Sequence, residues 1–160
     1  KLDKKRWFKN LNNFFNFIEY NYNLKIVIAS HPKIDHKKNS NIYGHRKVIK
    51  DKARDLIQNA NLVFLERSSA INFVIKFKKP AMIIHNEETI STSYNKRTHI
   101  GLSKLTGIRN IDIEKFSKKD LKDLYFVNKD KYLHFYKKYM NFKNIKLPNY
   151  IILKKKYLSL

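Results

Sequence analysis

Cysteine is absent from the 160-residue sequence, and glycine and proline occur only three times each. The absence of cysteine excludes disulfides, thiolate nucleophiles and cysteine-based zinc sites. The sequence has no Walker loop, no GxGxxG and no GxSxG, so phosphate binding by a glycine cradle is excluded. No apolar run approaches the roughly 18 residues that cross a bilayer. The opening residues, KLDKKRWFKN, are not followed by the apolar core of a signal peptide.

Acidic residues are few, with 13 Asp and Glu against 35 Lys and Arg, which gives a formal charge of +22. This charge would suit a polyanionic partner such as nucleic acid, an anionic membrane surface or phosphate groups. The basic residues comprise 29 Lys and 6 Arg, beside 18 Asn. AT-rich coding would produce this pattern at solvated positions without functional selection, so both interpretations stay open.

The hydrophobic content of 42% and the aromatic content of 14% predict a folded chain, and the length suits one domain over residues 1–160. Apolar spacing predicts that strands and helices alternate through the first 115 residues. Helices are expected over 4–20, 51–59, 69–77, 90–105 and 129–140, and strands over 25–30, 61–65, 81–85 and 108–113, with a possible short strand at 46–49. Ser117 is an expected helix cap, with Asp120 at the third helical position. The predicted fold class is α/β, a Rossmann-like parallel sheet flanked by helices, with a helical C-terminal region from about residue 115.

Two polar clusters follow predicted strands, Ser30-His31-Pro32 after KIVIA and Glu66-Arg67-Ser68-Ser69 after LVFL. Parallel sheets bind ligands beyond the carboxyl ends of their strands, near the point where the strand order reverses. If the two strands are neighbours, the serine hydroxyls and the helix start would hold phosphate oxygens, and His31 would donate a hydrogen bond or neutralise charge. The alternatives are a plain helix cap for the serines and a histidine bonded to the backbone.

Three further residues are candidates for the same site. Arg46, with Lys47 and Lys50, could reach the phosphates from the long loop, and Glu66 and Glu87 could contact a ribose or a base. Solvated charges are the alternative for each. The other histidines lack the spacing of a metal site, so no metal is expected.

The segments KIVIASHP and YGHRKVIKDKARDLIQNANLVFLERSSAINFVIKFKKP together resemble the donor-nucleotide half of bacterial GT-B glycosyltransferases. The resemblance is to enzymes that build capsule and lipopolysaccharide, polysialyltransferases above all, with similarity also to the teichoic acid glycerophosphate polymerases. The matching dipeptides are His31-Pro32, Ser68-Ser69 and Lys79-Pro80. The resemblance covers residues 25–84.

This resemblance implies one half of a GT-B architecture and an inverting transfer from a nucleotide-sugar donor, CMP- or UDP-linked, without a metal. By resemblance, His31 would stabilise the departing nucleotide, and Ser68, Ser69 and Arg46 would bind the donor phosphates. A missing N-terminal half would supply the glycan acceptor and the general base, so the chain, which begins at Lys1, is expected to be a fragment that does not turn over alone. The expected location is cytoplasmic, at the inner membrane face. The rival hypothesis is a basic α/β module that binds nucleic acid.

Overall fold

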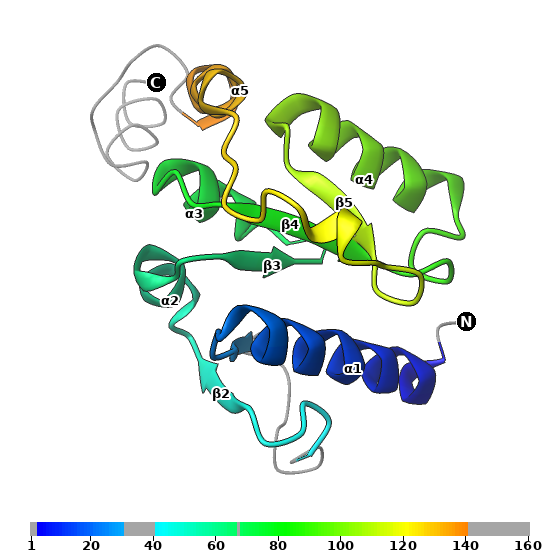
Figure 1. The fold of residues 1–160 in the computed structure, drawn as a ribbon. Coiled ribbons are helices and arrows are strands. Elements are labelled where there is room, and N and C mark those ends of the chain that lie inside the picture. The colour runs from blue at the N-terminus through cyan, green and yellow to red at the C-terminus, as the bar shows by residue number, and fades with distance from the viewer. Residues whose placement is uncertain (1–2, 31–40, 67, 141–160) are drawn as a thin grey trace, which may run out of the picture.

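Short runs rich in β-branched and other apolar residues form the strands, which pair in parallel (Figure 1). The computed structural model describes residues 3–30, 41–66 and 68–140. Within these residues the strands are β1 (Val27–Ser30), β2 (Lys47–Lys50), β3 (Val63–Leu65), β4 (Ala81–His85) and β5 (Arg109–Asp112). β1 and β2 form one sheet, and a second sheet has the order β3-β4-β5. The α/β prediction, with parallel strands flanked by helices, is therefore confirmed.

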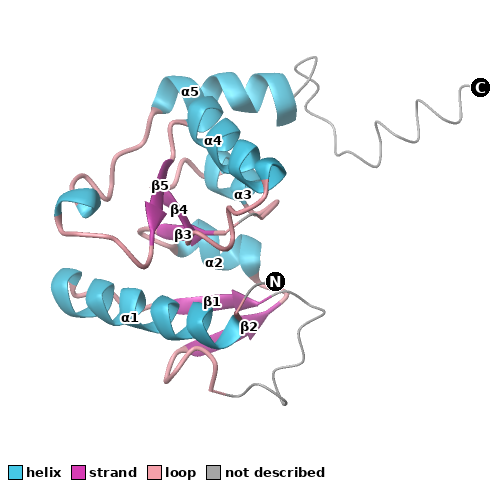
Figure 2. Ribbon diagram, turned by 90° about the vertical axis from the view of Figure 1, so that its right-hand side faces the viewer, coloured by secondary structure: helices cyan, strands magenta, loops and turns pink. Residues whose placement is uncertain are grey.

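Helices connect β2 to β3, β3 to β4 and β4 to β5, and helices cover both faces of the three-stranded sheet (Figures 1 and 2). The helical elements are α1 (Lys4–Tyr22), α2 (Ala53–Asn59), α3 (Ile71–Lys76), α4 (Ser93–Thr106), a 3-10 turn η2 (Lys119–Leu121), α5 (Lys129–Phe135) and a π-helical turn η3 (Tyr136–Met140). The described residues after β5 contain only helical elements and turns. None of the helices in the described ranges is long and apolar enough to cross a membrane.

The side chains of β4 and β5 alternate between two hydrophobic cores. Met82, Ile84 and Ile111 pack in the core formed with α1. Ala81 and Ile83 pack in the core on the opposite face, which includes residues of α2, α3 and α5. This alternation follows from the two-residue period of a strand, and it explains why β4 reads as a continuous apolar run.

Helix α1 is the longest helix in the described part of the chain and carries a continuous buried stripe. Asp3 caps its start by accepting a hydrogen bond from the Arg6 backbone N–H, and Asn23 ends it in the left-handed conformation. Phe14 is fully buried, and its ring meets the rings of Phe64 and Phe116 edge to face, with centroids 5.2 and 5.0 Å apart. The stripe Trp7, Leu11, Phe14, Phe15 and Ile18, read from the sequence, is the buried face of this helix.

Two local expectations differ from the structure. The helix expected at residue 90 begins at Ser93, because Asn86 and Thr89 form a hydrogen-bonded turn and Thr92 caps the helix through Asn95 N–H. Ser117 precedes a 3-10 turn rather than an α-helix. Its backbone N–H and its hydroxyl both donate to the Asp120 carboxylate, which holds this turn closed.

Replacing Phe14 by alanine should lower the free energy of unfolding by about 3–5 kcal/mol, because the change removes a fully buried ring and leaves a cavity. Urea unfolding at neutral pH measures this loss. Tyr20→Ala is the matched control on the same helix, since Tyr20 is 89% exposed and its loss should change stability little. Equal effects of the two substitutions would contradict the packing described for α1.

Candidate functional site

The described strands form two separate sheets, β1-β2 and β3-β4-β5, and β1 is not paired with β3. Ile28 of β1 and Phe64 of β3 nevertheless pack against the same core around α1. In doubly wound parallel sheets, ligands bind beyond the carboxyl ends of the strands, near the point where the strand order changes direction.

Ser68 and Ser69 lie exposed in the turn between β3 and α3. The Ser68 hydroxyl accepts a hydrogen bond from Ala70 N–H at 3.1 Å, and the Ser68 and Ser69 carbonyls accept from Ile71 and Asn72 N–H. Ser68 therefore closes a turn just before α3, whose N-cap is Ala70 without a side-chain cap hydrogen bond, so the helix-cap alternative is not met. Ser69 presents its side chain to solvent at the same turn.

Ser30, the last residue of β1, is buried, and the parallel register pairs it with Lys50 at the end of β2. Lys50 is exposed, so it is a cation beside the carboxyl end of β1. His31, which follows Ser30, lies outside the described residues, as does Arg67. The role predicted for His31 stays a prediction.

Arg46 lies in a buried cage on α1 rather than in the turn after β3. Its guanidinium donates to Asn12 at 2.9 Å, to Asn16 at 2.6 Å and to Glu19 at 2.6 Å. It also lies over the Phe15 ring, at 5.2 Å from the centroid. The side chain is only 1% exposed, which leaves no surface for a phosphate contact. Arg46 therefore fastens the segment before β2 to α1.

The two glutamates expected at a ribose or base lie at the ends of different strands. Glu66 follows β3 and is exposed. Burial raises the pKa of the Tyr43 phenol, and the charge of Glu66 raises it further. Glu87 follows β4 and forms an ion pair with Lys115. The two glutamates therefore follow different strands, and Glu87 already has a charged partner.

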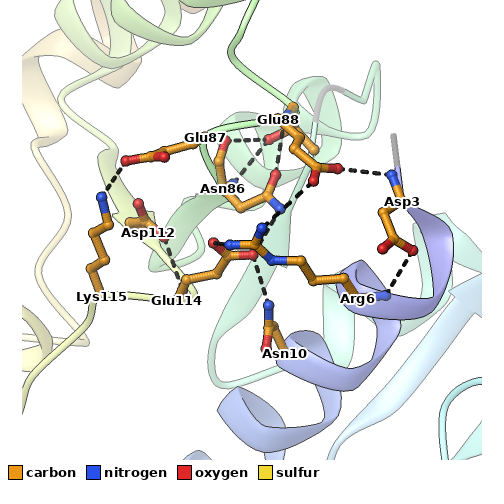
Figure 3. A network of polar contacts seen from close by, with 10 residues as sticks. Asp3, Arg6, Asn10, Asn86, Glu87, Glu88, Asp112, Glu114 and Lys115 are labelled. Carbon is orange, nitrogen blue, oxygen red and sulfur yellow. Dashed lines mark hydrogen bonds and ion pairs between the residues drawn. The ribbon is translucent and has the colours of Figure 1, made fainter. Parts of the chain in front are cut away.

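A carboxylate network joins α1 to the turns after β4 and β5 (Figure 3). The Glu114 side chain, 10% exposed, accepts hydrogen bonds from Arg6 at 2.8 Å, Asn10 at 2.7 Å and Asn86 at 3.1 Å. Glu88 accepts from the Asp3 backbone N–H at 2.8 Å. The hydrogen bond from Asn86 lowers the pKa of Glu114, and the contacts from Asn10 and Arg6 lower it further. Glu114 is thus a paired anion and not a free base.

No local pattern in the sequence predicts the network around Glu114, because Glu114 and its α1 partners are 104 and 108 residues apart. The Arg46 cage has a weak signal, because Asn12, Asn16 and Glu19 are spaced to share one face of a helix.

The partly buried His85 and the buried His99 meet under α4. The rings of His85, at the end of β4, and His99, on α4, lie edge to face with centroids 5.7 Å apart. No group of three or more His, Asp or Glu side chains that could hold a metal ion occurs within the described ranges. The pair is therefore part of the packing of α4 on the sheet.

The chain matches no family model, no curated protein and no solved structure. The resemblance to glycosyltransferases therefore depends on the dipeptides His31-Pro32, Ser68-Ser69 and Lys79-Pro80 and their order within residues 25–84.

Arg46→Ala should lower the free energy of unfolding by about 3 kcal/mol, because it leaves the Glu19 carboxylate without its charged partner in a largely buried position. Urea unfolding measures the change, and Lys47→Ala, an exposed neighbour, should have little effect. A variant of unchanged stability that has lost nucleotide binding would instead assign Arg46 to the ligand site.

Glu114→Gln should lower the free energy of unfolding at pH 7 by about 1–3 kcal/mol, because three donors lose a charged acceptor. The pKa of folded Glu114 lies below its ordinary value of 4.5. Its contribution is therefore fully present above that pH and is lost as the pH falls through the folded pKa.

The stability difference between the two proteins should accordingly shrink from pH 7 to about pH 3, as measured by urea unfolding. Glu87→Gln is the control, because the Glu87 side chain is 67% exposed and its ion pair should contribute little. A difference that does not depend on pH would show that the charge of Glu114 is unimportant.

Proposed function

We propose that this chain binds the nucleotide part of a nucleotide-sugar at the ends of β1 and β3, as the donor-binding portion of an inverting bacterial glycosyltransferase. The observation that carries this proposal is that β1 and β3 pack on the same α1 core, although they belong to the separate sheets β1-β2 and β3-β4-β5. These are the strands whose carboxyl ends carry Ser30-His31 and Ser68-Ser69. In parallel α/β sheets the carboxyl ends of the strands are the usual place for a nucleotide.

The residues at these strand ends suit the oxygens of a donor phosphate. Ser69 offers an exposed hydroxyl, while Ser68 keeps the turn closed through Ala70 N–H. Lys50, paired in register with Ser30, offers the positive charge that Arg46 cannot offer from its cage. His31 would stabilise the negative charge that develops on the departing nucleotide.

Sugar transfer would need a second partner. An acceptor hydroxyl, deprotonated by a base outside this chain, would attack the sugar carbon and displace the nucleotide. The resemblance to GT-B enzymes supplies this scheme, with the acceptor bound by another half of the enzyme. On this proposal the 160 residues bind donor and do not turn over alone, and they work at the cytoplasmic face of the membrane.

The test is a thermal-shift screen of the full chain with CMP, CDP, UDP and GDP at fixed ionic strength. One cytidine or uridine nucleotide should raise Tm by about 5–10 °C at a concentration near 100 times its Kd. Ser69→Ala should remove most of that shift. Ser93→Ala, an exposed serine at the start of α4, should keep it.

Two outcomes would overturn the proposal. Equal shifts with all four nucleotides, or shifts that Ser69→Ala leaves unchanged, would reduce the effect to general attraction between cations and anions. Affinity for single-stranded DNA or RNA that falls steeply with salt and does not depend on Ser69 would favour the nucleic-acid hypothesis instead.

A further inference from the structure

Residues 117–140, here called the edge segment, run from η2 to α5 and η3 along one side of the molecule (Figures 1 and 2). They follow β5, which is one of the two edge strands of the three-stranded sheet. Leu121, Leu124, Tyr132 and Phe135 anchor the segment in the two cores. The Tyr132 hydroxyl also donates to the Lys79 carbonyl at 3.0 Å. The edge segment is therefore held in place on its inner side.

The outer side of the edge segment is strongly basic. Seven lysines lie between Lys118 and Lys138, against the three aspartates Asp120, Asp123 and Asp130, a formal charge of +4 (seven minus three). All ten of these side chains are exposed. The Asp120 carboxylate is engaged locally, because it accepts both hydrogen bonds from Ser117. This surface attracts anions.

The same segment exposes large hydrophobic side chains. Four of the nine exposed large hydrophobic residues in the described part of the chain are Tyr125, Phe126, Leu133 and Tyr139. Tyr125 is 53% exposed and Phe126 is 60% exposed. Together with Tyr22 and Leu124 they line an open hollow of about 580 Å³.

The backbone of the turn before Tyr125 is what directs these rings outward. Leu121 and Leu124 are both buried, and Asp123 between them takes a left-handed φ of 57°. The Arg109 guanidinium donates to the Lys122 carbonyl and holds this turn against the start of β5. With both leucines committed to the core, Lys122, Tyr125 and Phe126 face solvent.

Exposed Phe, Tyr and Leu side chains among lysines suit the interface of an anionic bilayer, where aromatic rings enter the headgroup layer and ammonium groups meet lipid phosphates. We infer that the edge segment docks this protein on an anionic phospholipid surface through Tyr125, Phe126 and Leu133, with the lysines between 118 and 138 as counter-charges. This goes beyond the proposed nucleotide site and does not depend on it.

Nucleic acid is the other polyanion that such lysines attract, and its bases would stack on Tyr125 and Phe126. The bilayer is favoured by Leu133, which is 52% exposed on α5. The transfer of an aliphatic side chain from water into an apolar phase is favourable. A lipid bilayer provides such a phase, and a phosphodiester strand does not.

The first experiment is co-sedimentation of the full chain with vesicles of phosphatidylcholine, with and without phosphatidylglycerol, at fixed salt. Binding should require phosphatidylglycerol. The triple change Lys118→Gln, Lys119→Gln and Lys122→Gln should lower the partition coefficient roughly 100-fold, since each lysine at an anionic surface contributes about five-fold. The control Lys4→Gln, Lys5→Gln and Lys9→Gln removes the same charge from exposed positions on α1 and should lower it far less.

The second experiment follows insertion by fluorescence. The native Trp7 is buried in the core around α1, so its emission should not respond to vesicles. Phe126→Trp should show a blue shift with phosphatidylglycerol vesicles. Tyr94→Trp, at a position 70% exposed on α4, should not. Circular dichroism of each variant checks that it is folded.

Three results would overturn the inference. If the edge-segment variant and the α1 variant lose vesicle binding equally, the binding comes from general attraction between positive and negative charges. A blue shift of Tyr94→Trp equal to that of Phe126→Trp would place another face on the lipid. Single-stranded oligonucleotide affinity that depends on Phe126, without vesicle binding, would assign the edge segment to nucleic acid.

Discussion

The packing of α1 against both sheets is the interaction on which the rest of the structure depends. β1 and β2 form a sheet of only two strands, and an isolated pair of strands is marginally stable in water. Ile28 of this pair and Phe64 of the other sheet meet the same buried stripe of α1. Phe14 lies within that stripe, edge to face with Phe64. Loss of this packing would therefore separate the two-stranded sheet from the rest of the fold.

Polar contacts then fix where α1 lies along the sheets. Glu114 holds its first turns through Arg6 and Asn10, and Arg46 holds its second half through Asn16 and Glu19. Hydrophobic packing is nondirectional, so it could tolerate a helix shifted along its axis. The charge-assisted hydrogen bonds at both ends of α1 could not tolerate such a shift, because they require a narrow range of distances and angles.

The local elements were predictable, since periodicity is a property of neighbouring residues. The stripe from Trp7 to Ile18 and the apolar run of β4 both appear where the sequence places them. The partners of Arg46 and Glu114 were not predictable, because they join residues that only tertiary folding brings together. The arginine was therefore expected at a phosphate, whereas a carboxylate and amides of α1 surround it. The position of Ser68 and Ser69 after β3, and their exposure, could be predicted from the sequence.

The carboxyl edge of the three-stranded sheet is divided between structure and the proposed chemistry. The turns after β4 and β5 are occupied by the network around Glu114, which ties Asn86 and Glu88 to α1. After β3 the side chains of Glu66, Ser68 and Ser69 are exposed. A ligand that bound over β4 and β5 would displace hydrogen-bonded, paired carboxylates, whereas a ligand beyond β3 would meet the exposed hydroxyl of Ser69.

The two proposed contacts lie at opposite edges of the three-stranded sheet. A nucleotide beyond β3 would lie at one edge strand, whereas the edge segment follows β5, the strand at the other edge. Neither contact uses residues of the other, since Ser69 and Lys50 belong to the first and Tyr125 and Phe126 to the second. Binding of a nucleotide and docking on a membrane should therefore be compatible, and a membrane-bound chain would keep the turn after β3 open to a soluble donor.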